Sequence, residues 1–140
     1  MQIISFAWTT PALLAQAKDR TRRGWTADYA RRFHVCMNCQ GFDKGARNGG
    51  RGVAIVQLTQ DPYLERTGKM TEEDYAGEGF LWMEQNHYTM RGQHPREYFE
   101  KWKATNEMLY VVHFQILRVI EHLSTFLDRS ILQRELKIKQ

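Results

Sequence analysis

The alternation of apolar and polar residues along the chain predicts four β-strands. Three apolar runs rich in β-branched and aromatic residues, over 2–8, 53–59 and 108–120, favour extended structure. A fourth strand is expected over 34–42, where it leads into a glycine-rich turn at 45–50. The strands follow no fixed period, so the sequence does not indicate a repeat protein.

Helices are expected where a capping residue precedes apolar positions spaced three and four apart. Thr10 and Thr26 are suitable N-caps, and Thr71 with Asp74 has the spacing of a capping box. Pro95 begins a helix with an apolar stripe of aromatic side chains at Tyr98, Phe99 and Trp102. The expected helices cover residues 12–18, 26–33, 71–86, 95 onward and 123–136.

This order of elements predicts a mixed α+β fold, because the regular strand–helix–strand rhythm of a doubly wound sheet is missing. We expect a curved mixed sheet or small β-barrel with flanking helices and an extra C-terminal helix. The length of 140 residues and the 42% hydrophobic content fit one globular domain. We place this domain at 1–122 and treat 123–140 as an amphipathic helical extension.

Several classes of protein are disfavoured by the sequence. No stretch approaches the ~20 apolar residues of a membrane span, so no membrane partner is expected. The N-terminus lacks the basic start and apolar run of a signal peptide, and we expect a cytoplasmic protein. Cys36 and Cys39 are therefore expected as reduced thiols, and one C-x-x-C with a single nearby His34 does not complete a zinc site. We expect neither a metal nor a cofactor.

The net charge of +4 is distributed unevenly. Residues 1–52 carry nine Lys or Arg against three acidic residues, whereas 53–90 carry two against seven. The remainder carries nine against six. A basic lobe near an acidic segment is typical of a protein that attracts phosphates and keeps a carboxylate nearby. Complementary faces of a dimer, or plain solvated charge, fit the same distribution.

The densest cluster of candidate functional residues lies between Lys18 and Trp25. If the preceding helix continues, Lys18 and Thr21 lie on one face, roughly 5–6 Å apart at Cβ. Crowded cations and burial lower a lysine pKa, so Lys18 is a candidate base toward Thr21 or a water. The neighbouring guanidinium groups are candidates for binding phosphate, at Arg20, Arg22 and Arg23. Alternatively, these cations only complement a helix dipole.

Two further groups are candidates for contacts with nucleic acid. Trp25 follows the basic run directly and is a candidate for stacking on a base, although tryptophans are more often core residues. The glycine-rich segment carries Lys44, Arg47 and Arg51, which are candidates for phosphate contacts. The segment lacks the P-loop spacing, so a flexible basic hairpin tip explains it equally well.

The segment around Lys18 resembles the G-x-K-x-x-T-x-R motif of the ASCH family, with Lys18, Thr21 and Arg23 in the matching places and Ala17 in place of the glycine. The order of the surrounding segments is also similar to that of ASCH proteins, over residues 2 to about 120. These segments are Ile4-Ser5-Phe6, Asn48-Gly49-Gly50-Arg51-Gly52-Val53, Asp61-Pro62-Tyr63 and Glu78-Gly79-Phe80.

This resemblance implies a PUA-like barrel with a cleft, related to modules that bind RNA or modified bases. Some small members are similar to amidohydrolases that deacetylate N4-acetylcytidine with a lysine, a threonine and a glutamate. By position, Lys18 and Thr21 take the first two roles, and Glu78 is the candidate for the third. Glu78 as an ordinary exposed helix residue is the alternative, and Ala17 narrows the pocket if the glycine is required.

Three functions follow as hypotheses. The first is binding of RNA, single-stranded nucleic acid or a modified nucleoside in a basic cleft. The second is an amidohydrolase that acts on an acylated cytidine through Lys18, Thr21 and Glu78. The third is a protein interaction module that forms a homodimer through the C-terminal helix.

Overall fold

The computed structural model describes the backbone of residues 1–139 and the side chains of residues 1–131, so Gln140, the end of the expected extension, lies outside the described residues. The strands are β1 (Gln2–Ser5), β2 (Arg20–Arg23), β3 (Asn38–Phe42), β4 (Gly52–Leu58), β5 (Tyr63–Arg66) and β6 (Met108–Val119). The α-helices are α1 (Thr10–Leu14), α2 (Ala27–Ala30), α3 (Glu72–Gly77), α4 (Phe80–Gln85), α5 (Pro95–Thr105) and α6 (Leu123–Lys139). Short 3-10 helices are η1 (Ala7–Thr9), η2 (Ala46–Asn48) and η3 (Thr67–Lys69).

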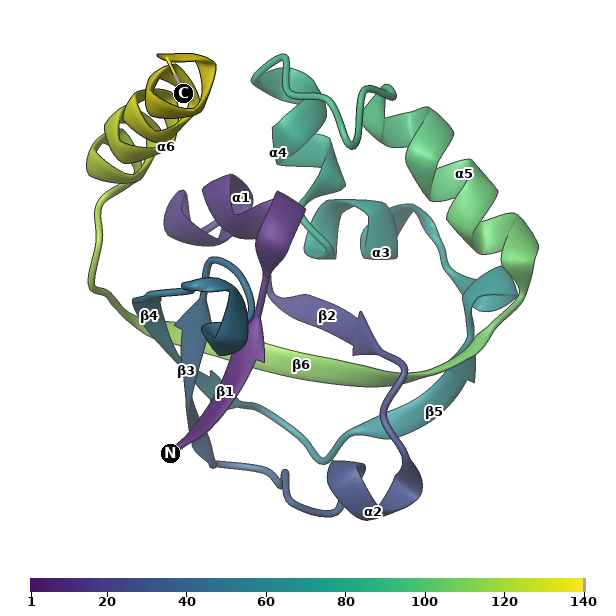
Figure 1. Cartoon of the computed structure of the whole chain (residues 1–140). Helices are drawn as coiled ribbons and strands as arrows, with labels where there is room; N and C mark the ends of the chain where they lie inside the picture. The colour runs from purple at the N-terminus through teal and green to yellow at the C-terminus, as the bar shows by residue number, and fades with distance from the viewer. Residues whose placement is uncertain (140) are drawn as a thin grey trace.

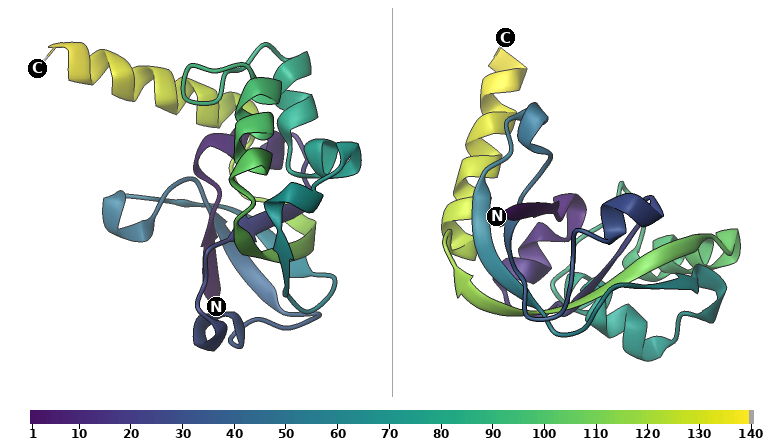
Figure 2. Two further views of the ribbon diagram at one scale, coloured as in Figure 1. Left: turned by 90° about the vertical axis from the view of Figure 1, so that its right-hand side faces the viewer. Right: turned by 90° about the horizontal axis from the view of Figure 1, so that it is seen from below.

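The strands form one curled sheet in the order β1-β3-β4-β6-β2, with β5 also paired to β6 (Figures 1 and 2). The pair β1–β3 is parallel, and the other pairs are antiparallel. The long strand β6 pairs with β2, β4 and β5, which makes it the spine of the sheet. A register shift at Ile55/Val56 in β4 helps the sheet to curl. The predicted mixed α+β class with a curved sheet is confirmed.

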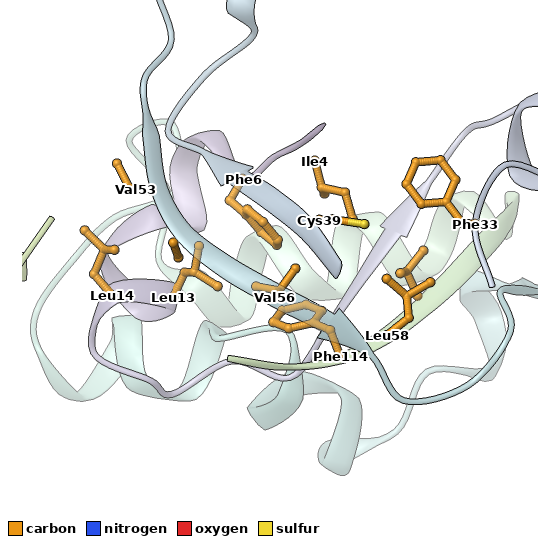
Figure 3. Close-up of a cluster of buried hydrophobic side chains, with 12 residues drawn as sticks. Ile4, Phe6, Leu13, Leu14, Phe33, Cys39, Val53, Val56, Leu58 and Phe114 are labelled. Atoms are coloured by element: carbon orange, nitrogen blue, oxygen red, sulfur yellow. The ribbon is translucent and has the colours of Figure 1, made fainter. Parts of the chain in front are cut away.

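One hydrophobic core fills the inside of the curl (Figure 3). Phe6 and Phe114 meet edge to face with ring centroids 5.5 Å apart, and Leu13 of α1 packs into the same cluster. Val56 and Leu58 come from alternating positions of β4. Each such large apolar side chain contributes about 1.5–3 kcal/mol on burial, which fixes α1 and the start of the chain against the sheet.

A second core lies between the helices α3, α4 and α5, which cover one side of the sheet (Figure 1). Tyr75 meets Phe99 edge to face at 5.1 Å, and Phe80 lies 5.7 Å from Phe99. Met70 and Met83 are also fully buried here. This cluster holds the two short helices α3 and α4 in place, and so it fixes the segment between them.

The structure corrects the prediction at the basic run. The expected helix over 12–18 ends at Leu14, and Gln16 has a left-handed φ of +60° that turns the chain. Residues 20–23 then form β2 rather than the end of a helix, and they pair with residues 110–113 of β6. Lys18 and Thr21 are therefore not neighbours on a helix face.

Several other elements also differ from the prediction. The expected strand over 2–8 ends at Ser5, and the expected helix over 26–33 ends at Ala30. The expected helix over 71–86 is divided into α3 and α4, because Gly79 has a φ of +97° that no α-helix accommodates. The expected strand over 34–42 begins only at Asn38, after Cys36 with a φ of +71°. Strand β5 was missed. The helix from Pro95, the strand over 108–120 and the C-terminal helix are confirmed within one to three residues.

The C-terminal helix α6 is anchored to the sheet at its start. Phe126 packs against the first core, and Arg129 bridges two buried carboxylates, Asp43 at 2.7 Å and Glu121 at 2.9 Å. Figure 2 shows the β3–β4 loop and α6 projecting from the body of the fold. A homodimer formed through α6 stays a prediction. In the described part of the chain, no helix combines the length and apolar character needed to cross a bilayer.

Candidate functional site

A pocket of about 160 Å³ lies between β2, η1, α4 and α5. Its polar lining consists of charged and hydroxyl side chains, chiefly Lys18, Thr21, Arg22, Arg23 and Glu78. Its apolar lining is mostly aromatic and includes Phe6, Trp8, Phe80, Met90, Tyr98 and Trp102. The three residues expected to act together, Lys18, Thr21 and Glu78, thus line one pocket.

Lys18 is held rigidly at the floor of this pocket. The turn after α1 is tied to the end of α3, because the backbone N–H of Asp19 donates to the carbonyl of Gly77 at 2.9 Å. The Lys18 Nζ donates to the backbone carbonyls of Arg20 and Glu78, both at 2.8 Å. Its side chain is only 1% exposed, so the amine has a fixed direction and little contact with solvent.

Glu78 is positioned by the break between α3 and α4. Its N–H donates to the carbonyl of Asp74 as the last turn of α3, and Gly79 then redirects the chain. The carboxylate accepts from Arg22 Nη1 at 2.9 Å and lies 3.9 Å from Lys18 Nζ. Its side chain is 4% exposed, which excludes the alternative of an ordinary exposed helix residue.

The buried charges alter each other's protonation. Burial lowers the pKa of Lys18 to about 8, an effect that Glu78 opposes and that Arg23 and Arg22 reinforce. Burial also raises the pKa of Glu78, against the opposing influence of Lys18 and Arg22. Both shifts favour the uncharged forms, so proton exchange with a bound ligand requires less free energy here than in water.

Thr21 and Arg23 follow the alternation of β2. The Arg23 Nε donates to Thr21 Oγ1 at 3.2 Å, and the guanidinium lies 5.6 Å from the ring centroid of Phe6. Burial lowers the pKa of Arg23 to about 10. Among the described residues, no carboxylate lies within ion-pair distance of Arg23, so its remaining donors are available to a ligand in the pocket.

Arg20 and Arg22, in contrast, are already engaged by carboxylates. Arg20 pairs with Asp19 at 2.8 Å and with Asp74 at 2.9 Å. Arg22 binds Asp74, Glu65 and Glu78 at 3.0, 3.1 and 2.9 Å. The expectation that both guanidinium groups bind phosphate therefore needs correction, because their Nη donors hold acidic side chains. The Nε of Arg22 is buried without a hydrogen-bond partner among the described residues.

The remaining predicted contact residues lie away from the pocket. Trp25 stacks on Phe33 at 4.2 Å and meets Tyr29 at 5.3 Å, so it packs on the first core rather than in the pocket. The cations of the glycine-rich segment lie in the β3–β4 loop, and none of them lines the pocket: Lys44, Arg47 and Arg51. Any contact that these residues make with nucleic acid stays a prediction.

Sequence reasoning missed most of the aromatic wall. Tyr98 and Trp102 were interpreted only as an apolar stripe, and nothing in their spacing distinguishes a pocket wall from a core. Trp8 was expected inside a strand, but it lies in η1 and is 51% exposed. Among the described residues, no group of three or more His, Cys, Asp or Glu side chains is arranged to hold a metal ion.

The curled sheet with its helical cover fits the small barrel or curved mixed sheet that the sequence predicts. No family model and no curated protein sequence matches the chain. Among solved structures, the fold is similar to the crystal structure of protein EF3133 from Enterococcus faecalis V583, described by the family model DUF984. The TM-score is 0.52 at 12% identity, over 83% of this chain and 74% of that chain. At this identity the likeness supports the fold alone.

Proposed function

We propose that the pocket binds a nucleobase, presented by single-stranded RNA or by a modified nucleoside. The observation that carries this proposal is the combination of an aromatic wall with a buried polar floor. A base has a flat π-face that stacks on aromatic rings and an edge that exchanges hydrogen bonds. The wall formed by Phe80, Tyr98 and Trp102 suits the face, and the floor suits the edge.

The floor offers donors and acceptors in fixed positions. Arg23 retains N–H donors, Thr21 supplies a hydroxyl that donates or accepts, and Glu78 supplies carboxylate oxygens.

The resemblance to ASCH proteins, stated above from Lys18, Thr21 and Arg23, points to a pyrimidine base as the ligand of this pocket, because some small members are similar to amidohydrolases that deacetylate N4-acetylcytidine.

Calorimetric titration with cytidine, uridine, adenosine and guanosine tests this proposal. We expect the pyrimidine nucleosides to bind, and Thr21→Val, which keeps the side-chain shape, to weaken binding about tenfold through the lost hydrogen bond. Arg31→Ala is the matched control, because Arg31 lies in an exposed pair with Asp28 on α2. Absence of binding for all four nucleosides, or equal effects of Thr21→Val and Arg31→Ala, would refute the proposal.

The second candidate function is the amidohydrolase, and the protonation of Lys18 favours it. The neutral Lys18 amine has two N–H groups, and these donate to the carbonyls of Arg20 and Glu78. Its lone pair is then free to accept a proton. Lys18 then takes the proton of Thr21 or of a water, and the oxygen attacks the amide carbonyl. Protonated Glu78 gives its proton to the leaving amino nitrogen as the C–N bond breaks. Where Thr21 is the nucleophile, a water then hydrolyses the acetyl ester on Thr21 Oγ1, which releases acetate and restores the hydroxyl.

Incubation with N4-acetylcytidine tests this second function, with acetate and cytidine measured by chromatography. We expect kcat/KM to pass through a maximum with pH, because Lys18, with a pKa of about 8, must be neutral while Glu78 must keep its proton. Lys18→Met should abolish turnover, and Arg31→Ala should leave it unchanged. Release of cytidine at the same rate by wild type and Lys18→Met, or no release by either, would contradict the mechanism.

A further inference from the structure

A second and larger cavity adjoins the pocket. This groove, of about 700 Å³, lies between η1, the α4–α5 loop and the start of α6. Ala7 and Trp8 line both the groove and the pocket, so the two hollows share one wall. Met90 lines the pocket while its neighbour Arg91 lines the groove. A ligand that extends past Ala7 and Trp8 therefore occupies both the pocket and the groove.

The turn that carries Met90 and Arg91 is held by its own hydrogen bonds. The residues Met90–Gln93 form a tight turn, closed by hydrogen bonds between Met90 and Gln93 at 2.7 and 3.0 Å. Arg91 and Gly92 at its tip both have positive φ, at +52° and +80°, as the two central residues of a type I′ turn do. A non-glycine residue in this conformation is strained and persists only where the surroundings enforce it. The turn thus fixes the backbone position from which the Arg91 side chain extends.

The chemistry of the groove suits a strand of nucleic acid. Trp8 is 51% exposed, and the Arg91 guanidinium lies 5.9 Å from its ring centroid. Arg91 supplies the positive charge of the lining, and the described lining contains no Asp or Glu. An exposed indole beside a cation, without opposing carboxylates, matches a stacked base followed by its phosphate.

We propose that the groove binds the nucleotide next to the base in the pocket, so that the ligand is a single-stranded polynucleotide rather than a free nucleoside. The neighbouring base stacks on Trp8, and the phosphate between the two nucleotides faces Arg91. This inference rests on the proposed function of the pocket and extends it. It also gives a role to the C-terminal helix, because Phe126 and Leu127 form the far side of the groove.

Calorimetric titration of the full chain with cytidine and with the dinucleotide CpC tests the inference, with RNA and DNA forms in parallel. We expect CpC to bind more tightly than cytidine, on the order of tenfold for one added stacked base. Arg91→Ala should remove most of this gain and reduce the salt dependence of CpC binding by about one counterion. The same variant should bind cytidine as wild type does.

The outcomes separate the two proposals. Arg31→Ala again serves as the control for loss of one exposed positive charge far from the groove. If cytidine binds but CpC binds no more tightly, and Arg91→Ala changes neither, the groove is not a nucleotide site and the pocket proposal stands. If neither ligand binds, both proposals fail. A preference for the RNA dinucleotide over the DNA form supports the inference and shows that the 2′-hydroxyl is read.

Discussion

Replacing Gly79 with alanine tests the physical basis of the candidate site. Gly79 has a φ of +97°, and a Cβ at this position lies 2.8 Å from the Cβ of Ala12 and 3.5 Å from that of Lys18. A left-handed conformation costs a non-glycine residue about 1–2 kcal/mol, and overpacking in a filled core adds about 1–3 kcal/mol. Reduced entropy of the unfolded chain returns about 0.4–1 kcal/mol. We therefore expect a loss of about 2–4 kcal/mol.

Gly92→Ala is the matched control for this change. Gly92 has a similar φ of +80°, but a Cβ there meets nothing within 4 Å. The control thus carries the backbone strain without the collision, and we expect a loss of about 1 kcal/mol. The difference between the two variants isolates the contact between the α3–α4 break and α1.

Urea denaturation followed by far-UV circular dichroism measures both losses, with the free energy taken from the midpoint at unchanged m. Because Glu78 precedes Gly79, we also expect Gly79→Ala to weaken ligand binding in the pocket and Gly92→Ala to leave nucleoside binding intact. Equal destabilisation by the two substitutions would show that Ala12 does not confine the break, and the account of how Glu78 is positioned would be wrong.

Three further predictions follow from other buried groups. The pKa of Lys18 is about 8 in the folded protein and 10.5 in the unfolded chain, so the unfolded chain binds more protons between pH 8 and 10.5. The free energy of unfolding, measured from urea midpoints, should therefore rise by about 3 kcal/mol as the pH increases from 8 to 10.5. Lys18→Met should lack that rise. Arg129→Ala leaves the carboxylate of Asp43 unpaired, so amide hydrogen exchange over 123–131 should accelerate while β6 stays protected, and unchanged exchange would contradict the anchoring of α6. Burial raises the pKa of Cys39 to about 11 and Cys36 is exposed, so a thiol reagent should modify one cysteine in the native protein and two in urea.

The sequence predicted those elements whose apolar pattern is long and regular. The strand over 108–120 and the helix from Pro95 have enough turns or alternations for the period to be clear, and both appear as expected. Strand β5 has only four residues, and exposed side chains occupy most of it. Its pairing with β6 comes from contacts distant in sequence, which no local pattern encodes.

The basic run was misassigned for a related reason. Arg20 and Arg22 are buried in β2, although a run of cations normally marks a solvated surface. Their burial depends on carboxylates that lie 43 to 56 residues further along the chain. The residues near Arg20 and Arg22 in the sequence do not indicate these distant ion pairs. Lys18 and Glu78 were nevertheless identified as members of one site, because the resemblance to ASCH proteins carried information about distant contacts.

This internal network accounts for part of the uneven charge along the chain. The acidic segment 53–90 supplies the partners of the β2 arginines through Glu65, Asp74 and Glu78, so three of its seven acidic residues are paired inside the molecule. Neither a complementary dimer face nor plain solvation is needed to account for these acidic residues.

The alternation of β2 then divides the basic run between two tasks. Arg20 and Arg22 are engaged by acidic side chains and fasten α3 to the sheet. Thr21 and Arg23, at the intervening positions, bond to each other and have no carboxylate partner among the described residues. Removing a guanidinium from a buried ion pair leaves an unpaired charge and is costly, so the carboxylates keep Arg22 in place. Arg23 has no such partner, and its N–H groups can donate to a ligand. Glu78 joins the two sets, since it accepts from Arg22 while it lies beside Lys18 in the pocket.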